Sequence, residues 1–147
     1  MTADPIVQAC ERRDLNALSA LVPYSRFLGM ELLADGDDAL MVHLPFAEHL
    51  VGNPTIPALH GGTVASVLET AAIFNAVWQP GVIGVPKTIN ITVDYLRPGR
   101  PEATFSRAIV TKLGRNVASV NATAWQSDPG RPIATALVHL LIRTRAR

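Results

Sequence analysis

The sequence has little of several residue types, and each shortage narrows the classes of protein it can belong to. Its 147 residues include one cysteine, Cys10, so no intramolecular disulfide framework can form and a reducing compartment is favoured. The 13 Lys and Arg nearly balance the 12 Asp and Glu, for a formal charge of +1, which gives no strong field for nucleic acid or an anionic membrane. Aromatic residues reach only 5%, too few for stacking on single-stranded nucleic acid.

Long apolar runs and closely spaced metal ligands are also missing. Polar residues interrupt every apolar stretch before the roughly 18 to 20 residues that span a bilayer. The polar and acidic start, Met1 to Asp4, is unlike a signal peptide. The 4 histidines lack the paired spacing of metal ligands. The sequence therefore predicts a cytoplasmic protein with no metal, no cofactor, no membrane segment and no nucleic-acid partner.

What the sequence does contain is a large apolar fraction. Hydrophobic residues make up 48% and charged residues 17%, a composition that excludes disorder. The length suits one compact domain and is enough to bury a core without disulfides. We expect a single domain over residues 1–147, in which residues 1–24 form an N-terminal helical extension.

The spacing of apolar residues predicts two helices and six strands. One amphipathic helix is expected over 4–22 and a second, without Pro or Gly and apolar all round, over 63–78. Strands are expected at 27–34, 39–46, 88–96, 103–113, 117–126 and 133–142. The stretch 47–60 is expected to be a loop, and 133–142, apolar on both faces, a central strand. Short turns between consecutive strands imply an antiparallel sheet, so the second helix must pack across its apolar face and be buried on every side.

One carboxylate, Glu69, interrupts the apolar second helix. An unpaired carboxylate among apolar neighbours is costly and needs a partner, a water-lined cleft or a proton. One interpretation is structural, with the side chain facing solvent or forming an ion pair at an interface. The other is catalytic, because carboxylates in perturbed surroundings cluster at active sites.

The string His60-Gly61-Gly62 stands directly before this helix. Two glycines let a ligand approach the backbone closely, and the first N–H groups of a helix have no partner within it. These N–H groups and the positive end of the helix dipole suit an oxygen that gains negative charge. The alternative is that the glycine pair only permits a tight turn into the helix.

Four strings together resemble the hotdog-fold thioesterases of the phenylacetate-degradation (PaaI-like) type. They are VGNP at 51–54, LHGGT at 59–63, ITVDYLRP at 91–98 and LGR at 113–115. The acid at Glu69, nine positions after His60, completes the most specific of these patterns, and the last two strings are supporting motifs. The likeness covers about residues 25–143, so the N-terminal helix lies outside it.

The resemblance implies an α+β hotdog fold, with about six antiparallel strands wrapped around one long central helix. It also implies hydrolysis of acyl-coenzyme A thioesters by a homodimer, or by a dimer of dimers, with two sites at the dimer interface. Glu69 would be the nucleophile or general base, and the Gly61 N–H would polarise the thioester carbonyl. Asn53 matches the polar residue that positions water or the carbonyl, and His60 would support its loop.

Further residues are expected to bind the substrate. Gly62 belongs to the helix start, and the acyl pocket would be lined by Leu68, Ala72, Val85 and Pro86. The phosphates of coenzyme A would be held by basic side chains at strand ends, namely Lys87, Arg97 and Arg115. For each of these three, a solvated surface charge is the alternative.

Helix geometry gives a separate reason to expect two chains. Glu69 follows Gly61 by 69 − 61 = 8 positions, which places them about 12 Å apart along the helix axis. A reacting carbonyl must lie about 3 Å from both the oxyanion donor and the attacking group. If both residues act in one reaction, they come from different subunits, and a two-fold axis then creates two equal sites.

Two other functions fit the same fold. A hotdog domain can bind acyl-CoA without hydrolysing it, as a sensor or assembly module, although such a binder has no need for an acid in an apolar helix. A hydratase or dehydratase also acts on acyl thioesters, but its usual pairing of a histidine with an acid is not found. Fold alone does not decide between these functions.

Overall fold

The N-terminal region consists of three short helices. The computed structural model describes residues 3–146, beginning with α1 (Pro5–Glu11), α2 (Leu15–Ala20) and α3 (Pro23–Phe27). The single helix expected over 4–22 is therefore wrong. Arg13 has a φ of 51°, which a right-handed helix does not allow. Asp14 then caps α2 by accepting a hydrogen bond from the N–H of Ala17.

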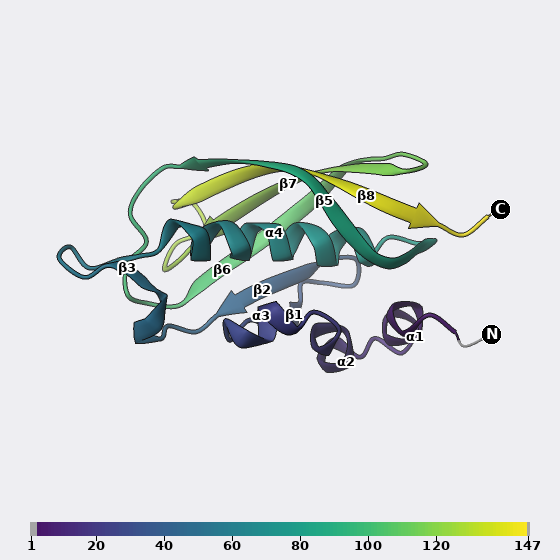
Figure 1. The fold of residues 1–147 in the computed structure, drawn as a ribbon, viewed down its shortest axis with the longest axis horizontal. Helices are drawn as coiled ribbons and strands as arrows, with labels where there is room; N and C mark the ends of the chain where they lie inside the picture. Colours follow the sequence, from purple (N-terminus) through teal and green to yellow (C-terminus); the bar gives the residue numbers. More distant parts are fainter. Residues whose placement is uncertain (1–2, 147) are drawn as a thin grey trace.

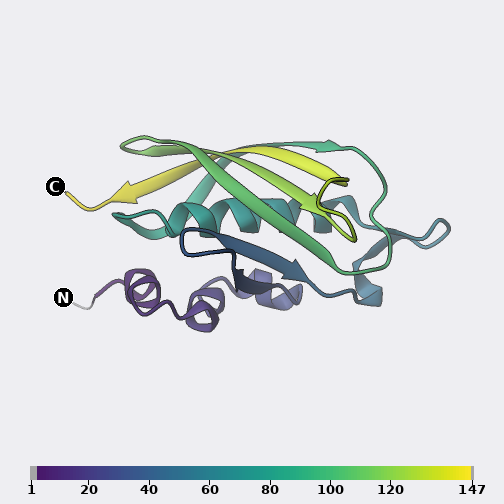
Figure 2. The same ribbon diagram turned by 180° about the vertical axis from the view of Figure 1, so that it is seen from behind.

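Six antiparallel strands form the main sheet (Figures 1 and 2). Their order across the sheet is β1 (Glu31–Ala34), β2 (Leu40–Leu44), β6 (Thr104–Leu113), β7 (Val117–Trp125), β8 (Ala134–Thr144) and β5 (Val82–Tyr95). The expected six-stranded antiparallel sheet is confirmed. The first strand is shorter than expected because α3 and the turn at Gly29, with a φ of 88°, occupy its start. The strand at β5 is longer, since it begins directly after Gly81.

The last strand, β8, lies inside the sheet between β7 and β5, but only one of its faces is buried. Ala136, Val138 and Leu140 point into the core. Leu137 and Leu141 point outwards and stay 43% and 46% exposed. The expected central position of this strand is confirmed, although no helix among residues 3–146 covers the outer face of the sheet (Figure 1).

The stretch 47–60 is more ordered than the expected loop. It contains a 3-10 turn, η1 (Glu48–Leu50), and a small hairpin of β3 (Val51–Asn53) and β4 (Ala58–Leu59). The hairpin extends away from the body of the molecule beyond the start of α4 (Figures 1 and 2). A glycine is required at Gly52, because a Cβ there would lie 2.6 Å from the Cα of His60.

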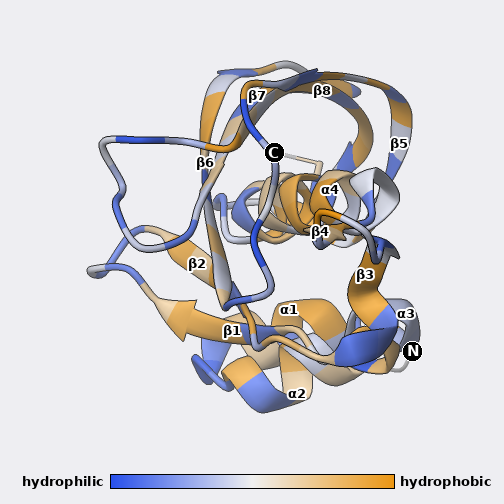
Figure 3. Cartoon of the chain, turned by 90° about the vertical axis from the view of Figure 1, so that its left-hand side faces the viewer, coloured by the Kyte–Doolittle hydropathy of each residue, from blue (hydrophilic) through white to orange (hydrophobic). Residues whose placement is uncertain are grey.

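The long helix α4 (Gly61–Val77) runs through the middle of the fold. Figure 3 looks along it and shows β6, β7, β8 and β5 arching over the helix. The side towards the sheet is fully buried, but the opposite side is only half-buried or exposed. We call this side the open stripe, and its residues are Gly62, Ala65, Ser66, Glu69, Thr70 and Ile73. Within one chain, then, the helix is not buried on every side as expected.

The deepest polar side chain of α4 is Asn75, which is 3% exposed. Its Oδ1 accepts from the N–H of Leu40 at 3.0 Å, and its Nδ2 donates to the carbonyls of Leu40 and Ala71, each at 2.9 Å. Asn75 therefore closes the backbone hydrogen bonds at the start of β2 and ties that strand to the helix.

Replacing this side chain should weaken the fold strongly. We expect Asn75→Ala to lower the free energy of unfolding by about 2–4 kcal/mol, because it leaves buried groups of Leu40 without partners. Urea denaturation measures the change. The control is Asn121→Ala on the exposed face of β7, expected to stay within about 0.5 kcal/mol of the unaltered protein. Equal stabilities for the two variants would contradict this role of Asn75.

Candidate active site

The start of α4 leaves one backbone donor free. The Nδ1 of His60, the capping residue, accepts from the N–H of Gly62 at 2.9 Å, and its carbonyl accepts from Thr63 at 2.9 Å. No hydrogen bond among the described residues uses the N–H of Gly61. This N–H stands at the positive end of a 17-residue helix, so it is suited to bind an oxygen that carries negative charge.

Tyr95, at the end of β5, fixes this helix start. Its hydroxyl donates to the carbonyl of Gly61 at 2.7 Å. The contact ties the last residue of the strand to the first residue of the helix and so orients the free Gly61 N–H. Sequence reasoning placed Tyr95 in a strand but gave it no role, because the contact depends on tertiary packing across 34 positions.

Glu69 lies on the open stripe, two turns after the helix start. Its carboxylate makes no hydrogen bond or ion pair with the described residues. Burial removes water from it and raises its pKa above the ordinary value for glutamic acid. Asn75, buried more deeply in the same helix, is fully hydrogen-bonded, whereas the half-buried carboxylate of Glu69 has no such partner among residues 3–146.

The remaining predicted catalytic residue, Asn53, is in the projecting hairpin. Its Oδ1 accepts from the N–H of Thr55 at 3.0 Å, and the side chain is exposed. On the open stripe, the Ser66 hydroxyl donates to the carbonyl of Gly62 at 2.8 Å. Within one chain the structure therefore groups His60, Gly61 and Gly62, while Glu69 stands about 12 Å further along the helix.

The expected acyl-pocket residues fall into two groups. Leu68 and Ala72 are 0% exposed and belong to the hydrophobic core between α4 and the sheet, so a ligand would reach them only if the core opened. Val85 is 46% exposed and Pro86 is buried, both on β5. Of these four residues, only Val85 is exposed on the surface of one chain.

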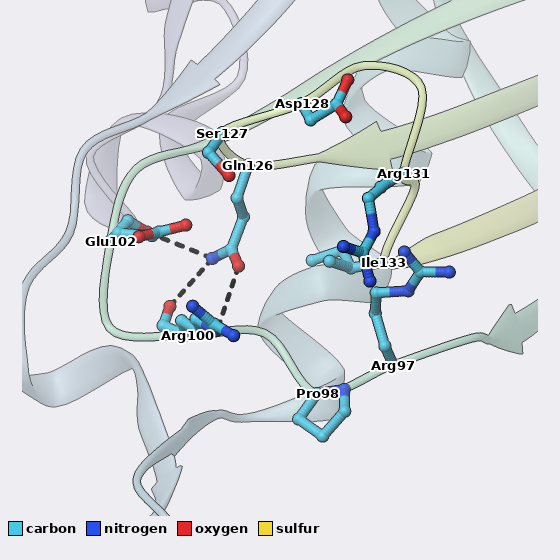
Figure 4. Close-up of a pocket in the computed structure, with 9 residues that line it drawn as sticks. All are labelled: Arg97, Pro98, Arg100, Glu102, Gln126, Ser127, Asp128, Arg131 and Ile133. Carbon is cyan, nitrogen blue, oxygen red and sulfur yellow. Dashed lines mark hydrogen bonds between the residues drawn. The ribbon is translucent and has the colours of Figure 1, made fainter.

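The three expected phosphate-binding residues lie far apart. Arg97 follows β5 near the start of α4, beside a hollow of about 150 Å³ that also contains Arg131 and the acids Glu102 and Asp128 (Figure 4). Lys87 is exposed on β5. Arg115 lies at the tip of the hairpin between β6 and β7, beside a larger hollow past the end of α4. These residues do not form one binding site within a chain.

Residues 3–146 contain neither a metal-binding cluster nor a membrane-spanning helix. No group of three His, Cys, Asp or Glu side chains in this range is arranged to hold a metal ion. None of the helices in this range is both long enough and apolar enough to cross a bilayer.

Known proteins resemble this chain in sequence and in fold. The family model of the acyl-CoA thioesterase N-terminal domain matches residues 52–141. Medium/long-chain acyl-CoA thioesterase YigI of Escherichia coli is 31% identical over 110 residues, which cover 66% of this chain and 71% of YigI. A solved structure from Chromobacterium violaceum is 31% identical, with a TM-score of 0.76, and covers 97% of this chain and 98% of that chain.

A protein from Bacillus halodurans, solved with CoA, covers 97% of this chain and 93% of that chain with a TM-score of 0.70. It is 22% identical, so this likeness shows the fold alone. The architecture is the hotdog fold of the thioesterase superfamily, which confirms the expected fold class. The chain belongs to the acyl-CoA thioesterase family. Its narrower placement in the PaaI-like type stays a prediction.

Proposed function

We propose that this protein hydrolyses acyl-CoA thioesters at sites that two copies of the chain form together. The proposal depends mainly on one observation, the half-buried and unpartnered Glu69 on the open stripe. A second copy with its α4 antiparallel would bring this carboxylate to the free N–H of the other copy's helix start. At each site one chain then supplies the Gly61 N–H and the other supplies the Glu69 carboxylate.

The edge of the sheet supports this pairing. The 14-residue strand β5 is hydrogen-bonded to β8 on one side, and no strand among residues 3–146 pairs with its other edge. It carries exposed apolar side chains at Val85, Ile89 and Tyr95. A long, apolar, unpaired edge promotes association in water. A two-fold pairing at this edge would cover β5 and the open stripe together.

The chemistry needs only these groups. The thioester carbonyl accepts a hydrogen bond from the Gly61 N–H, and the partner's Glu69 attacks the carbonyl carbon or removes a proton from a water that does. In the water route the carbonyl oxygen gains negative charge near the helix start, the C–S bond breaks, and coenzyme A leaves as thiolate. The proton on Glu69 then passes to the thiolate. Thiolate is a good leaving group, so a strong general acid is not required.

Thiol release from a panel of acyl-CoAs tests the function. The likeness to YigI leads us to propose medium and long acyl chains as the preferred substrates. We expect free coenzyme A to appear at enzyme-dependent rates, detected with a thiol-reactive dye. The alternative is a non-catalytic acyl-CoA-binding module, which would bind the same compounds without releasing thiol. Binding without release would overturn the proposal.

The pH dependence of the rate follows from the surroundings of Glu69. Burial raises the pKa of this carboxyl, and only the ionised form can attack or accept a proton. We therefore expect kcat/KM to fall on the acid side at a higher pH than an exposed glutamate would cause. A pH–rate profile measures the pH at which this fall occurs. The assignment would be contradicted if the fall stayed at the same pH when Glu69 is replaced by Asp, or if it occurred at the ordinary pKa of glutamic acid.

A further inference from the structure

A large hollow of about 1010 Å³ lies past the C-terminal end of α4. Its walls come from three segments: 80–83, which leads from α4 into β5, the tip of the β6–β7 hairpin at 113–116, and the end of β8 at 142–146. These segments meet at the end of the molecule opposite the β3–β4 hairpin (Figure 1). The Glu69 mechanism does not use this hollow.

Three arginines surround it, which are Arg115 from the hairpin and Arg143 and Arg145 from β8 and its extension. None of the described residues that line the hollow is acidic. One carboxylate lies nearby, since an Oε1 of Glu11 is 3.7 Å from Arg145, but both side chains are well exposed and such a pair is weak. We call this site the arginine hollow. It has a net positive charge that nothing in its lining neutralises.

The backbone around the arginine hollow is held in place. The N–H of Arg145 donates to the carbonyl of Gly81 at 2.9 Å, and the N–H of Ile142 donates to Asn116 at 2.8 Å. A Cβ at Gly84, whose φ is +69°, would lie 2.7 Å from an Nη of Arg143. The Arg143 guanidinium therefore lies directly against β5 at Gly84. Any larger residue at that position would collide with it. The arginines project from β8 and the β6–β7 hairpin, which these hydrogen bonds join to each other and to the segment before β5.

Another hollow lined by arginines differs in both charge and size. At about 150 Å³ it is much smaller, and its lining includes the acids Glu102 and Asp128 as well as Arg97, Arg100 and Arg131 (Figure 4). Its wall is also tied together by Gln126, which accepts from the N–H of Arg100 at 2.9 Å and donates to its carbonyl at 2.8 Å. Nearby carboxylates repel phosphate, so the arginine hollow is the better site for a polyanion.

The position of the hollow suits an extended substrate. Val77, the end of α4, is eight positions beyond Glu69, or about 12 Å along the axis. Gly61 of the same chain lies about twice as far from the end of α4 as Glu69 does. A ligand whose reacting end is beside Glu69 would therefore reach the arginine hollow of the same chain only if a long arm separated that end from its anionic groups. Coenzyme A has such an arm, the pantetheine unit, between its thioester and its phosphates.

We propose that the arginine hollow binds the phosphate groups of coenzyme A, on the protomer that supplies Glu69 to the reaction. This inference rests on the proposed function and adds which side chains recognise the nucleotide half of the substrate. Of the basic residues expected from the sequence, it keeps Arg115 and assigns Arg97 and Lys87 no phosphate contact. Arg143 and Arg145 are additions from the structure.

The test compares two substrates with the same acyl group, acyl-CoA and acyl-pantetheine, which lacks the phosphates. We expect Arg115→Ala and Arg143→Ala each to raise KM for acyl-CoA by about tenfold or more, the loss of one charge-assisted contact. The kcat values, and all constants for acyl-pantetheine, should stay within about twofold of the unaltered protein. Arg131→Ala, in the smaller hollow, is the matched control and should change neither substrate.

Two results would overturn the inference. One is an unchanged KM for acyl-CoA in the Arg115 and Arg143 variants, and the other is an equal loss with both substrates, which would show a structural role. If the unaltered protein hydrolyses neither substrate, the proposed function fails. The hollow is then tested by calorimetry with adenosine 3′,5′-bisphosphate and with inorganic phosphate. Binding of the nucleotide that the Arg143 variant loses would support the site, and its absence would refute it.

Discussion

Glu69→Gln is expected to lower kcat for acyl-CoA hydrolysis by about 10³-fold, within the range that general bases and nucleophiles contribute. The amide has nearly the shape of the carboxylate, so substrate binding should change only a few-fold. Single-turnover kinetics and calorimetry with the coenzyme A product separate the two effects. The reason for the large loss is that no other carboxylate lies on the open stripe of α4.

Stability provides the control for this variant. Burial raises the pKa of Glu69 in the folded protein, so the ionised carboxylate reduces the stability at pH values above its ordinary pKa. The Glu69→Gln protein should therefore unfold at an equal or higher temperature at neutral pH, and the difference should shrink as the pH falls through the raised pKa of Glu69 and vanish below the ordinary value. Glu48→Gln, an exposed glutamate in η1, should alter neither rate nor stability. A Glu69→Gln enzyme with nearly full turnover would remove Glu69 from the mechanism.

Gly61→Pro is expected to lower kcat by about 10²-fold to 10³-fold, the loss that follows removal of one oxyanion donor. Gly61 is the first residue of α4, where proline is well tolerated because its missing N–H has no partner within the helix. The preceding residue, His60, has φ −62° and ψ 132°, the extended conformation that proline requires before it. The substitution therefore removes the N–H and keeps the helix.

Gly61→Ala is the matched control because it keeps the N–H and adds only a methyl group. An ideal Cβ at this position would lie 3.4 Å from the Tyr95 hydroxyl oxygen at its closest, so the added atom needs little adjustment. We expect its kcat to stay within about fivefold of the unaltered protein. Equal activity of the proline and alanine variants would show that the Gly61 N–H does not stabilise the reaction.

The sheet and the long helix could be predicted from the sequence because each has a clear local signal. These signals are the alternation in β5 from Thr88 onwards and the mainly apolar stretch of α4, which has no Pro or Gly after Gly62. The break between the first two N-terminal helices was harder to predict. Arg13 adopts a left-handed conformation within an apolar pattern that continues across it, and the cap at Asp14 was the only signal of the break.

The candidate site was predictable in part for the same reason. Gly61, Gly62 and Glu69 stand in one helix, where spacing alone defines their geometry. Tyr95 and Arg143 could not be found this way, because their contacts join segments that are distant in the sequence. The open stripe was also unpredictable, since the helix is apolar all round and only the sheet determines which side it covers.

The central claim is that each active site takes Gly61 from one chain and Glu69 from the other, and mixing two inactive variants tests it directly. Glu69→Gln and Gly61→Pro proteins are unfolded together in equal amounts and refolded, so that half of the dimers contain one chain of each kind. In such a dimer one of the two sites has both groups intact, so the mixture should regain about a quarter of the activity of the unaltered protein. A mixture that stays as inactive as its two components would contradict the account.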